Sequence, residues 1–295
     1  MRDPDIHQRA VALYDAFTHI HHDRRTFMRD LTLLAGSAAA ATSLLTAIGA
    51  DPAAAAIIAA GDPSIKAQEI SWQGSAAGRI LKGYSARLAG PIIKRPAIMV
   101  IHENRGLNDH IRDVTRRLAL AGYLAVAPDF LSIAGGTPTD QDAARDMIGK
   151  LDLTATVADA VTTVKWLARL NQSTGKVGTV GFCWGGAMAN RVAASAGDKL
   201  RAAVAYYGPA PDPARATSVK AAMLFHYAGL DERVNASAAA WISALRAAKV
   251  PVDAYTYDGV NHAFANDTAV GRYDKAASDL AWARTLAFFK PRLMV

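Results

Sequence analysis

Apolar and polar positions follow two alternating patterns from about residue 67 to the end of the chain. Short continuous apolar runs, such as 97–101 and 202–206, are typical of strands buried on both faces of a sheet. Between these runs lie longer segments whose apolar residues recur with the helical period. Buried strands that alternate with helices predict an α/β fold with a mostly parallel sheet covered by helices on both faces.

The predicted elements leave a small number of loops in which chemistry is expected. An antiparallel hairpin is predicted over 68–73 and 79–88, because the small residues of 74–78 separate its strands. Further strands are expected at 97–101, 124–127, 177–180, 202–206, 222–227 and 252–257, and helices at 111–121, 139–149, 153–170, 187–196, 236–248 and 273–290. Functional residues of such sheets gather beyond the carboxyl ends of the strands. The segments of interest are therefore 102–108, 181–186, 228–234 and 258–264.

The first sixty residues show a different pattern. Arg24-Arg25-Thr26-Phe27-Met28-Arg29 precedes an uncharged, Ala-rich run over 31–50 that has no polar face. A charged segment, a moderately apolar run and small residues beyond it are the parts of an export signal, and the paired arginines indicate the twin-arginine route. We therefore predict a leader over 1–60, cleaved among the alanines of about 50–60, a globular domain over 61–295, and a periplasmic protein that uses the twin-arginine export machinery. The alternative is an uncleaved N-terminal anchor in the inner membrane, because the run over 31–50 is long enough to span a bilayer.

Composition narrows the class of protein. Of the 295 residues 51% are apolar, which is ample for a packed core, and the formal net charge is +7. The basic residues are scattered and do not form a block interleaved with aromatic residues, so nucleic-acid binding is not expected. A single cysteine excludes an intramolecular disulfide and a cysteine-based zinc site.

That cysteine stands in the most informative motif of the chain. Residues 177–186 read VGTVGFCWGG, so an apolar strand runs into Cys183 and a helix-forming segment follows. This is the layout of a nucleophile elbow, a sharp strand-to-helix turn that presents a reactive side chain. Gly181 and Gly185 supply the small neighbours that such a strained turn needs. We interpret Cys183 as a catalytic nucleophile, although a lone cysteine is most often an inert core residue.

An acid and a base follow the cysteine in the order nucleophile, acid, histidine that α/β-hydrolases use. Asp231 and His262 each lie just beyond a predicted strand. His262 would act on the thiol, and Asp231 would fix the imidazole tautomer. Asp231 could instead cap the helix that follows it. His226 lies inside a strand and is better explained as a hydrogen-bonded core residue.

The loop after the strand 97–101 supplies the remaining candidates. The pair His102-Glu103 does not form the zinc motif H-E-x-x-H, because position 106 is Gly106. Glu103 could hydrogen-bond the thiol in the resting state. The backbone N–H of Asn104 could form an oxyanion hole together with the N–H of Trp184.

These motifs resemble the dienelactone hydrolases (carboxymethylenebutenolidases) of the α/β-hydrolase fold. The resemblance covers about residues 67–290 and is specific in HENRGLN at 102–108, GKVGTVGFCWGG at 175–186, GLDERV around Asp231 and GVNHAF around His262. It implies that Cys183 is the nucleophile, His262 the base, Asp231 the orienting acid and Glu103 the partner of the resting thiol. It also implies a lactone or small ester as substrate, an acyl-thioester intermediate, and no metal or organic cofactor.

The chain departs from this family where the substrate carboxylate is bound. Asn266 stands where members carry an arginine four residues after the histidine, and no arginine occurs in 131–138. Arg105 or Arg272 could supply a replacement charge. Without one, neutral esters or lactones are expected to be the better substrates.

Two other classes of function stay open on the sequence alone. Class I glutamine amidotransferases also place a cysteine in a G-x-C-x-G elbow, but they use a His-x-Glu pair, and here Phe264 is the second residue after His262. A binding protein on the same fold, without turnover, is the other alternative.

Overall fold

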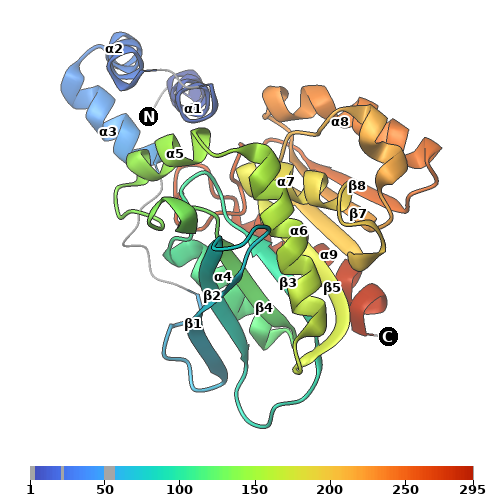
Figure 1. Cartoon of the computed structure of the whole chain (residues 1–295). Helices are drawn as coiled ribbons and strands as arrows, with labels where there is room; N and C mark the ends of the chain where they lie inside the picture. Colours follow the sequence, from blue (N-terminus) through green and yellow to red (C-terminus); the bar gives the residue numbers. More distant parts are fainter. Residues whose placement is uncertain (1–3, 21–22, 50–56, 295) are drawn as a thin grey trace.

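The computed structural model describes residues 4–20, 23–49 and 57–294, and its central feature is an eight-stranded sheet (Figure 1). The strand order is β1-β2-β4-β3-β5-β6-β7-β8. β2 pairs antiparallel with β1 and with β4, and the remaining neighbours pair in parallel. The strands are β1 Ile65–Gln73, β2 Ile80–Leu88, β3 Arg95–Ile101, β4 Leu124–Asp129, β5 Ser173–Phe182, β6 Ala202–Tyr206, β7 Ala222–Ala228 and β8 Val252–Tyr257. The predicted α/β class, mostly parallel sheet and opening hairpin are confirmed.

Helices cover both faces of this sheet. The helices of the sheet region are α4 Asp109–Leu120, α5 Gln141–Gly149, α6 Leu153–Arg169, α7 Trp184–Ala193, α8 Glu232–Ala247 and α9 Lys275–Phe289, with 3-10 turns η1 Ser132–Ala134, η2 Gly197–Lys199 and η3 Pro213–Ser218, and the π-turn η4 Lys290–Met294. One core contains apolar residues of α4 and α9, and the other contains those of α6, α7 and α8. Along β3, Ile98 and Val100 point into the first core while Met99 and Ile101 point into the second. Burial on both sides explains why β3 reads as an unbroken apolar run.

The N-terminal residues form helices α1 Pro4–His19, α2 Arg24–Ala35 and α3 Ala38–Ile48. They share a small core of their own, in which Phe17 of α1 stacks on Phe27 of α2 with ring centroids 4.5 Å apart. In Figure 1 these helices lie together at one end of the molecule, next to α5. We refer to α1, α2 and α3 together as the cap.

The apolar run over 31–50 is not one helix. α2 ends at Gly36, which adopts the left-handed conformation, and Ser37 caps the start of α3. Within the described ranges no single helix has the length and apolar character to cross a membrane, while α2 and α3 reach that length only as a pair bent by 107°. The predicted cleavage region falls partly on residues 50–56, which lie outside the described residues. The leader and the boundary at residue 60 stay predictions.

Candidate active site

Cys183 occupies a strained turn between β5 and α7. Its φ of 55° and ψ of −116° are unusual for a residue with a side chain. A Cβ on Gly181 would lie 1.9 Å from the carbonyl oxygen of Gly185, and one on Gly185 would lie 2.3 Å from the carbonyl oxygen of Ile101. Both neighbours must therefore be glycine for the turn to close against β3. This is the geometry of the nucleophile elbow that the sequence indicates.

Asp231 and His262 form a buried pair beside the elbow. The Nδ1–H of His262 donates to Oδ2 of Asp231 at 2.5 Å, and Oδ1 of Asp231 accepts from the backbone N–H of Val234. Asp231 is also the N-cap of α8, so the same carboxylate contacts His262 and caps this helix.

The electrostatics of this pair favour an ion pair. Burial alone would lower the pKa of His262, but the negative charges of Asp15 and of Cys183 as a thiolate, together with the hydrogen bond to Asp231, raise this pKa well above its ordinary value. Burial opposes ionisation of Asp231, yet the hydrogen bond from His262 keeps its pKa below the ordinary value. Once the thiol has ionised, the imidazole is therefore held in its charged form.

A residue that sequence reasoning missed contacts the thiol. His19, the last residue of α1, has its Nε2 3.0 Å from Sγ of Cys183, and its ring packs edge-on against His262 with centroids 4.7 Å apart. The two residues are separated by 164 positions in the chain. The sequence did contain a signal: Ala10, Tyr14 and Phe17 stand at the i, i+4, i+7 spacing of one helix face, and the structure buries all of them. A buried helix face ahead of the paired arginines is not a part of an export signal, so it would have indicated that α1 packs against other residues.

Glu103 lies in the same region but has other partners. Its Oε2 accepts from Nδ2 of Asn266 at 2.6 Å, and its Oε1 accepts from the hydroxyl of Tyr207 at 3.4 Å. Burial and the charge of Glu103 raise the pKa of Tyr207 well above its ordinary value, so that hydroxyl stays a donor. In the described part of the chain, no hydrogen bond joins Glu103 to Cys183. Asn266 thus positions a carboxylate of the site.

The loop that holds Asn104 packs directly against the elbow. Trp184 is the first residue of α7, so its backbone N–H belongs to the group that a helix leaves without an internal partner. The ring of His102 stacks on the Trp184 indole with centroids 5.2 Å apart. The Nδ1–H of His102 donates to the carbonyl oxygen of Glu103, and Nε2 accepts from the N–H of Phe130. His102 therefore fixes the positions of both predicted oxyanion donors.

A cavity of about 320 Å³ opens at Cys183. Its walls include His19, Trp184 and apolar side chains of α5 and α7. Of the residues that the structure describes, three arginines also line it, Arg145, Arg191 and Arg233, and no Asp or Glu does. The Nε and Nη2 atoms of Arg233 are buried and have no hydrogen-bond partner among the described residues. A guanidinium in this state is suited to bind an anion that enters the cavity.

Arg105 and Arg272, the proposed substitutes for a substrate-binding arginine, contact the cap. Arg105 donates to the hydroxyl of Tyr14 at 3.0 Å, and to Asp142. Nε of Arg272 donates to the carbonyl oxygen of Ile48 at 3.1 Å, and its guanidinium lies over the Tyr14 ring. Both side chains are buried by these contacts.

Metal binding at this site would compete with a nucleophilic role. His19, Cys183 and His262 each offer a donor atom, and these atoms lie within 4.8 Å of one another. One sulfur and imidazole nitrogens are donors that Zn²⁺ accepts. An ion held there would occupy the candidate nucleophile and base together.

Comparison with known proteins identifies the family of this chain. The profile of the Dienelactone hydrolase family matches residues 81–293. The chain belongs to the dienelactone hydrolase family. A protein of Escherichia coli O157:H7 named “Putative carboxymethylenebutenolidase” is 33% identical over 259 residues, which cover 82% of this chain and 93% of that protein. This dienelactone hydrolase family member is thus a hydrolase that acts on ester or lactone bonds.

Solved structures support the α/β-hydrolase fold. The crystal structure of a “Putative Dienelactone Hydrolase” from Klebsiella pneumoniae is 30% identical, covers 76% of this chain and 98% of its own, and gives a TM-score of 0.68. The dienelactone hydrolase-like promiscuous phosphotriesterase P91 from metagenomic libraries is 23% identical and covers 78% of this chain and 99% of its own, with a TM-score of 0.70. At this identity the likeness shows the fold alone. The family profile begins at residue 81, so His19 and the cap lie outside the matched range.

Proposed function

We propose that this family member hydrolyses a small lactone or ester through an acyl-thioester on Cys183. The observation that carries the proposal is the strained backbone of Cys183 beside the buried, hydrogen-bonded His262–Asp231 pair. Such a turn costs free energy and is retained where it presents a nucleophile. A charged imidazole stabilises the thiolate that attacks.

Acylation uses these residues in a fixed order. The thiol proton passes to Nε2 of His262, and Sγ attacks the carbonyl carbon of the substrate. The oxyanion that forms accepts hydrogen bonds from the N–H groups of Trp184 and Asn104. The carbon–oxygen bond to the alkoxy group then breaks, and His262 gives its proton to the leaving oxygen. In a lactone the new hydroxyl stays attached to the acyl group.

Deacylation regenerates the enzyme. His262 takes a proton from a water molecule as the water oxygen attacks the thioester carbon. The carbon–sulfur bond breaks, a carboxylic acid leaves, and the thiolate returns to its place beside the imidazolium. Asp231 keeps Nδ1 protonated throughout, so that Nε2 always faces the reaction.

The cavity supports an anionic acyl group as substrate. The expectation of neutral substrates depended on the absence of an arginine at position 266 and in 131–138. Arg233, in the first turn of α8, provides buried Nε and Nη2 atoms without a hydrogen-bond partner, and none of the described residues that line this cavity is acidic. We therefore propose that a carboxylate of the substrate binds Arg233.

Hydrolysis of a matched pair of p-nitrophenyl esters, the neutral acetate and the anionic succinate monoester, tests both proposals. Cys183→Ala should lower kcat/KM for each ester by about 10³-fold or more, because only binding and oxyanion stabilisation are left. Arg233→Gln should lower kcat/KM for the anionic ester by about 10- to 100-fold, the value of one charge-assisted contact, and spare the acetate. A covalent acyl adduct on Cys183, detected by intact-mass spectrometry, completes the test.

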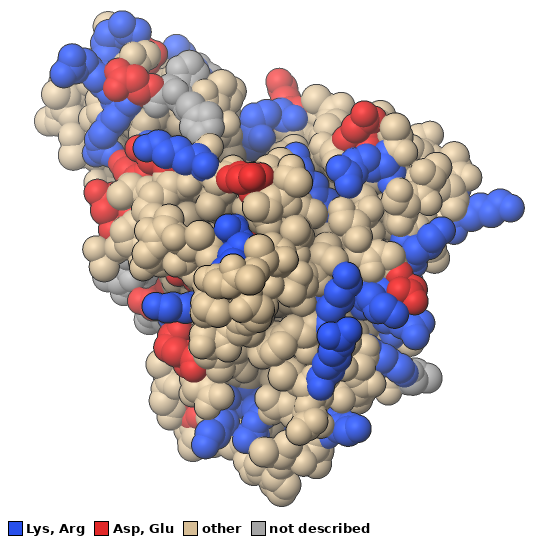
Figure 2. Space-filling view, viewed as in Figure 1, with Lys and Arg blue, Asp and Glu red and all other residues tan. Residues whose placement is uncertain are grey.

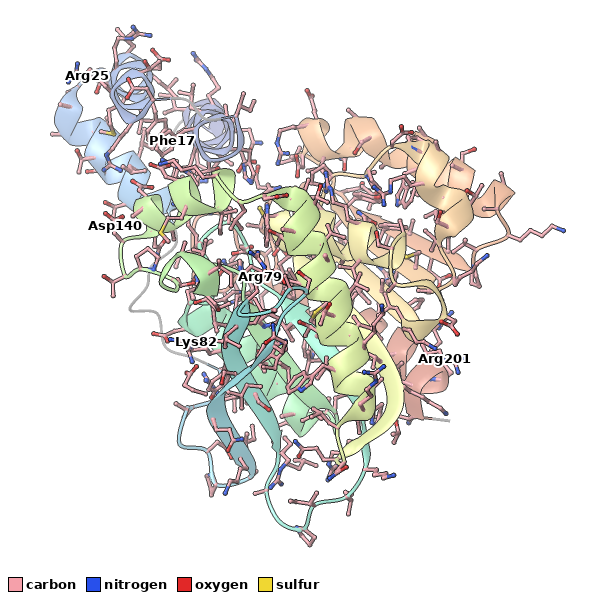
Figure 3. The ribbon with its side chains drawn as sticks, viewed as in Figure 1. Phe17, Arg25, Arg79, Lys82, Asp140 and Arg201 are labelled. Carbon is pink, nitrogen blue, oxygen red and sulfur yellow. The ribbon has the colours of Figure 1, made fainter. Side chains whose placement is uncertain are left out.

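The control for Arg233 is Arg201→Gln. Arg201 is exposed and lies far from the cap and the elbow (Figure 3). Arg201→Gln should leave kcat/KM for both esters unchanged. Wild-type rates in Cys183→Ala would refute the thioester mechanism, and an equal loss on both esters in Arg233→Gln would refute the anion contact alone.

We further propose export by the twin-arginine route. The support is the Arg24-Arg25 pair at the start of α2 and the uncharged run behind it. Arg25 is exposed and lies on the side of the cap that faces away from the sheet (Figure 3). Export machinery could therefore reach this residue on the folded protein. The resulting location is the periplasm, with an N-terminally anchored form as the alternative.

A further inference from the structure

The C-terminal end of α1 lies across the entrance to the thiol. Nδ2 of Asn104 donates to the carbonyl oxygen of Thr18 at 3.0 Å, which ties this end of the helix to the loop after β3. The next residue, His19, then reaches Sγ of Cys183. With His19 in this position only 5% of the Cys183 surface is exposed.

The partners of His19 determine which atom carries the proton in this contact. Nδ1 of His19 lies 2.8 Å from the carbonyl oxygen of Asp15, which can only accept, so Nδ1 carries the hydrogen. Burial and the positive charge of His262 lower the pKa of His19 well below its ordinary value, so the ring is neutral. Nε2 therefore has a lone pair and no hydrogen. A hydrogen bond of 3.0 Å to Sγ requires that the thiol keeps its proton and donates it.

This contact competes with the one that catalysis needs. Nε2 of His262 is buried, and no described residue hydrogen-bonds it. The thiol hydrogen points to His19, so it is not available to His262. A protonated sulfur that donates to another group is also a poor nucleophile.

The cap docks through a specific interface. Besides Arg105 and Arg272, Arg145 of α5 places its guanidinium 4.2 Å above the ring of Phe17, and Phe17 lies on the side of the cap that faces α5 (Figure 3). A Cβ on Gly271 would lie 2.1 Å from the backbone oxygen of Ala47, so the domain approaches α3 closely at a residue without a side chain. On the face shown in Figure 2, basic and acidic side chains of the cap and of the domain lie close together where the two meet.

We propose that, in the chain that still carries residues 1–60, His19 of the cap reaches into the active site and holds the Cys183 thiol in a resting, protonated state, from which substrate, or cleavage of the predicted leader, must displace it. The inference rests on the proposed function, in which Sγ is the nucleophile. His19 is thus a positioning residue of the closed state. Release of α1 lets Sγ pair with His262.

Alkylation of the full-length protein by iodoacetamide, in EDTA at neutral pH, tests the proposal directly. Cys183 is the only cysteine, so every adduct reports on this thiol. His19→Ala should react about 3- to 10-fold faster than wild type, the equivalent of one hydrogen bond. His19→Gln keeps an acceptor atom, so its alkylation rate should lie between those of wild type and His19→Ala. Alkylation needs no turnover, so it tests His19 even if the protein hydrolyses no ester.

Thr42→Ala is the control, because Thr42 is an exposed residue of the cap whose hydroxyl donates to the carbonyl oxygen of Ala38 in its own helix rather than to the domain or the thiol. It should react at the wild-type rate. A rate for His19→Ala that equals or falls below the wild-type rate would overturn the proposal. With an ester substrate, His19→Ala should lower KM and keep kcat, whereas a loss of kcat at constant KM would make His19 a catalytic base instead.

A second variant moves the cap without touching His19. Gly271→Ala places a methyl group against the backbone of Ala47, which side-chain rotation cannot relieve, so α3 must shift. Alkylation of Cys183 should again become faster. An unchanged rate in a folded Gly271→Ala protein would show that cap docking does not control the thiol.

Discussion

Histidines take three different roles in this protein, and only their surroundings distinguish them. His262 is hydrogen-bonded to Asp231, which favours its charged form, His19 is neutral against the thiol, and His226 is enclosed in the sheet core. His226 has Nδ1 2.9 Å from the Tyr257 hydroxyl and Nε2 3.0 Å from the Thr285 hydroxyl. It is the hydrogen-bonded core histidine that its place within a strand indicated.

His226 makes stability depend on pH. Burial and the charge of Arg284 lower its pKa to about 3, against about 6.5 in the unfolded chain. Between these values the unfolded state binds more protons, so the free energy of unfolding falls as the pH falls from about 6.5 towards 3. His226→Gln keeps polar contacts but cannot titrate. In urea unfolding at pH 6.5 and pH 5, the variant should lose about 2 kcal/mol less than wild type. Equal losses would mean that His226 is protonated in the native state.

Sequence patterns located the candidate site residues because each follows a strand. Cys183 comes directly after β5, and Asp231 and His262 lie in the loops that follow β7 and β8, at the carboxyl ends of the strands. His19 has no such marker. Its position depends on how α1 docks against residues more than eighty positions away, such as Asn104. It also depends on the hydrogen bonds that Arg105 and Arg272 donate to the cap. Local patterns do not contain that information.

At the scale of elements, the turn between β5 and α7 is the most constrained segment. α7 begins at Trp184, ahead of the predicted start at 187, because the elbow leads straight into helical geometry. α8 likewise begins at Glu232 rather than 236, because Asp231 caps it. The strand and helix order was predictable, since buried runs and helical periods are local. The first residues of these helices were not predictable, because they depend on contacts of single side chains.

Gly185→Ala should destabilise the protein strongly. The new Cβ would meet the backbone oxygens of Ile101 and His102 at 2.3 and 2.5 Å, and neither can move without shifting β3. A loss of about 3 kcal/mol or more in the free energy of unfolding is expected in urea titration. Gly61→Ala is the control, because nothing lies within 4 Å of a Cβ there, and its effect should stay within about 0.5 kcal/mol. Similar small effects in both variants would contradict the packing argument.

At the scale of the whole molecule, the cap joins the proposed export signal to the proposed active site. The side chain of Arg24 pairs with Asp142 in the first turn of α5, and that of Arg25 is exposed. From the sequence we predicted that the first sixty residues are separate from the domain, because an Ala-rich run without a polar face is typical of a leader. In the structure the same residues contact the domain through α1 and α3.

Changing Arg24 and Arg25 together to Lys should keep the protein in the cytoplasm, because the twin-arginine route requires the paired guanidinium groups. Arg29→Lys, on the same helix but outside the pair, should leave export intact. Cell fractionation followed by immunoblotting measures both. Full recovery of the double variant from the periplasm would argue against this route.

The single cysteine has a consequence for oxidative damage. A thiol oxidised to sulfenic acid is normally rescued by a second cysteine that forms a disulfide, and this chain has none. Peroxide that reached Cys183 could therefore carry it on to the sulfinic acid, which is irreversible in most proteins. A neutral thiol covered by α1 reacts slowly with peroxide, because the thiolate is the reactive form. The contact with His19 that delays catalysis thus also protects a group that the protein has no internal means to repair.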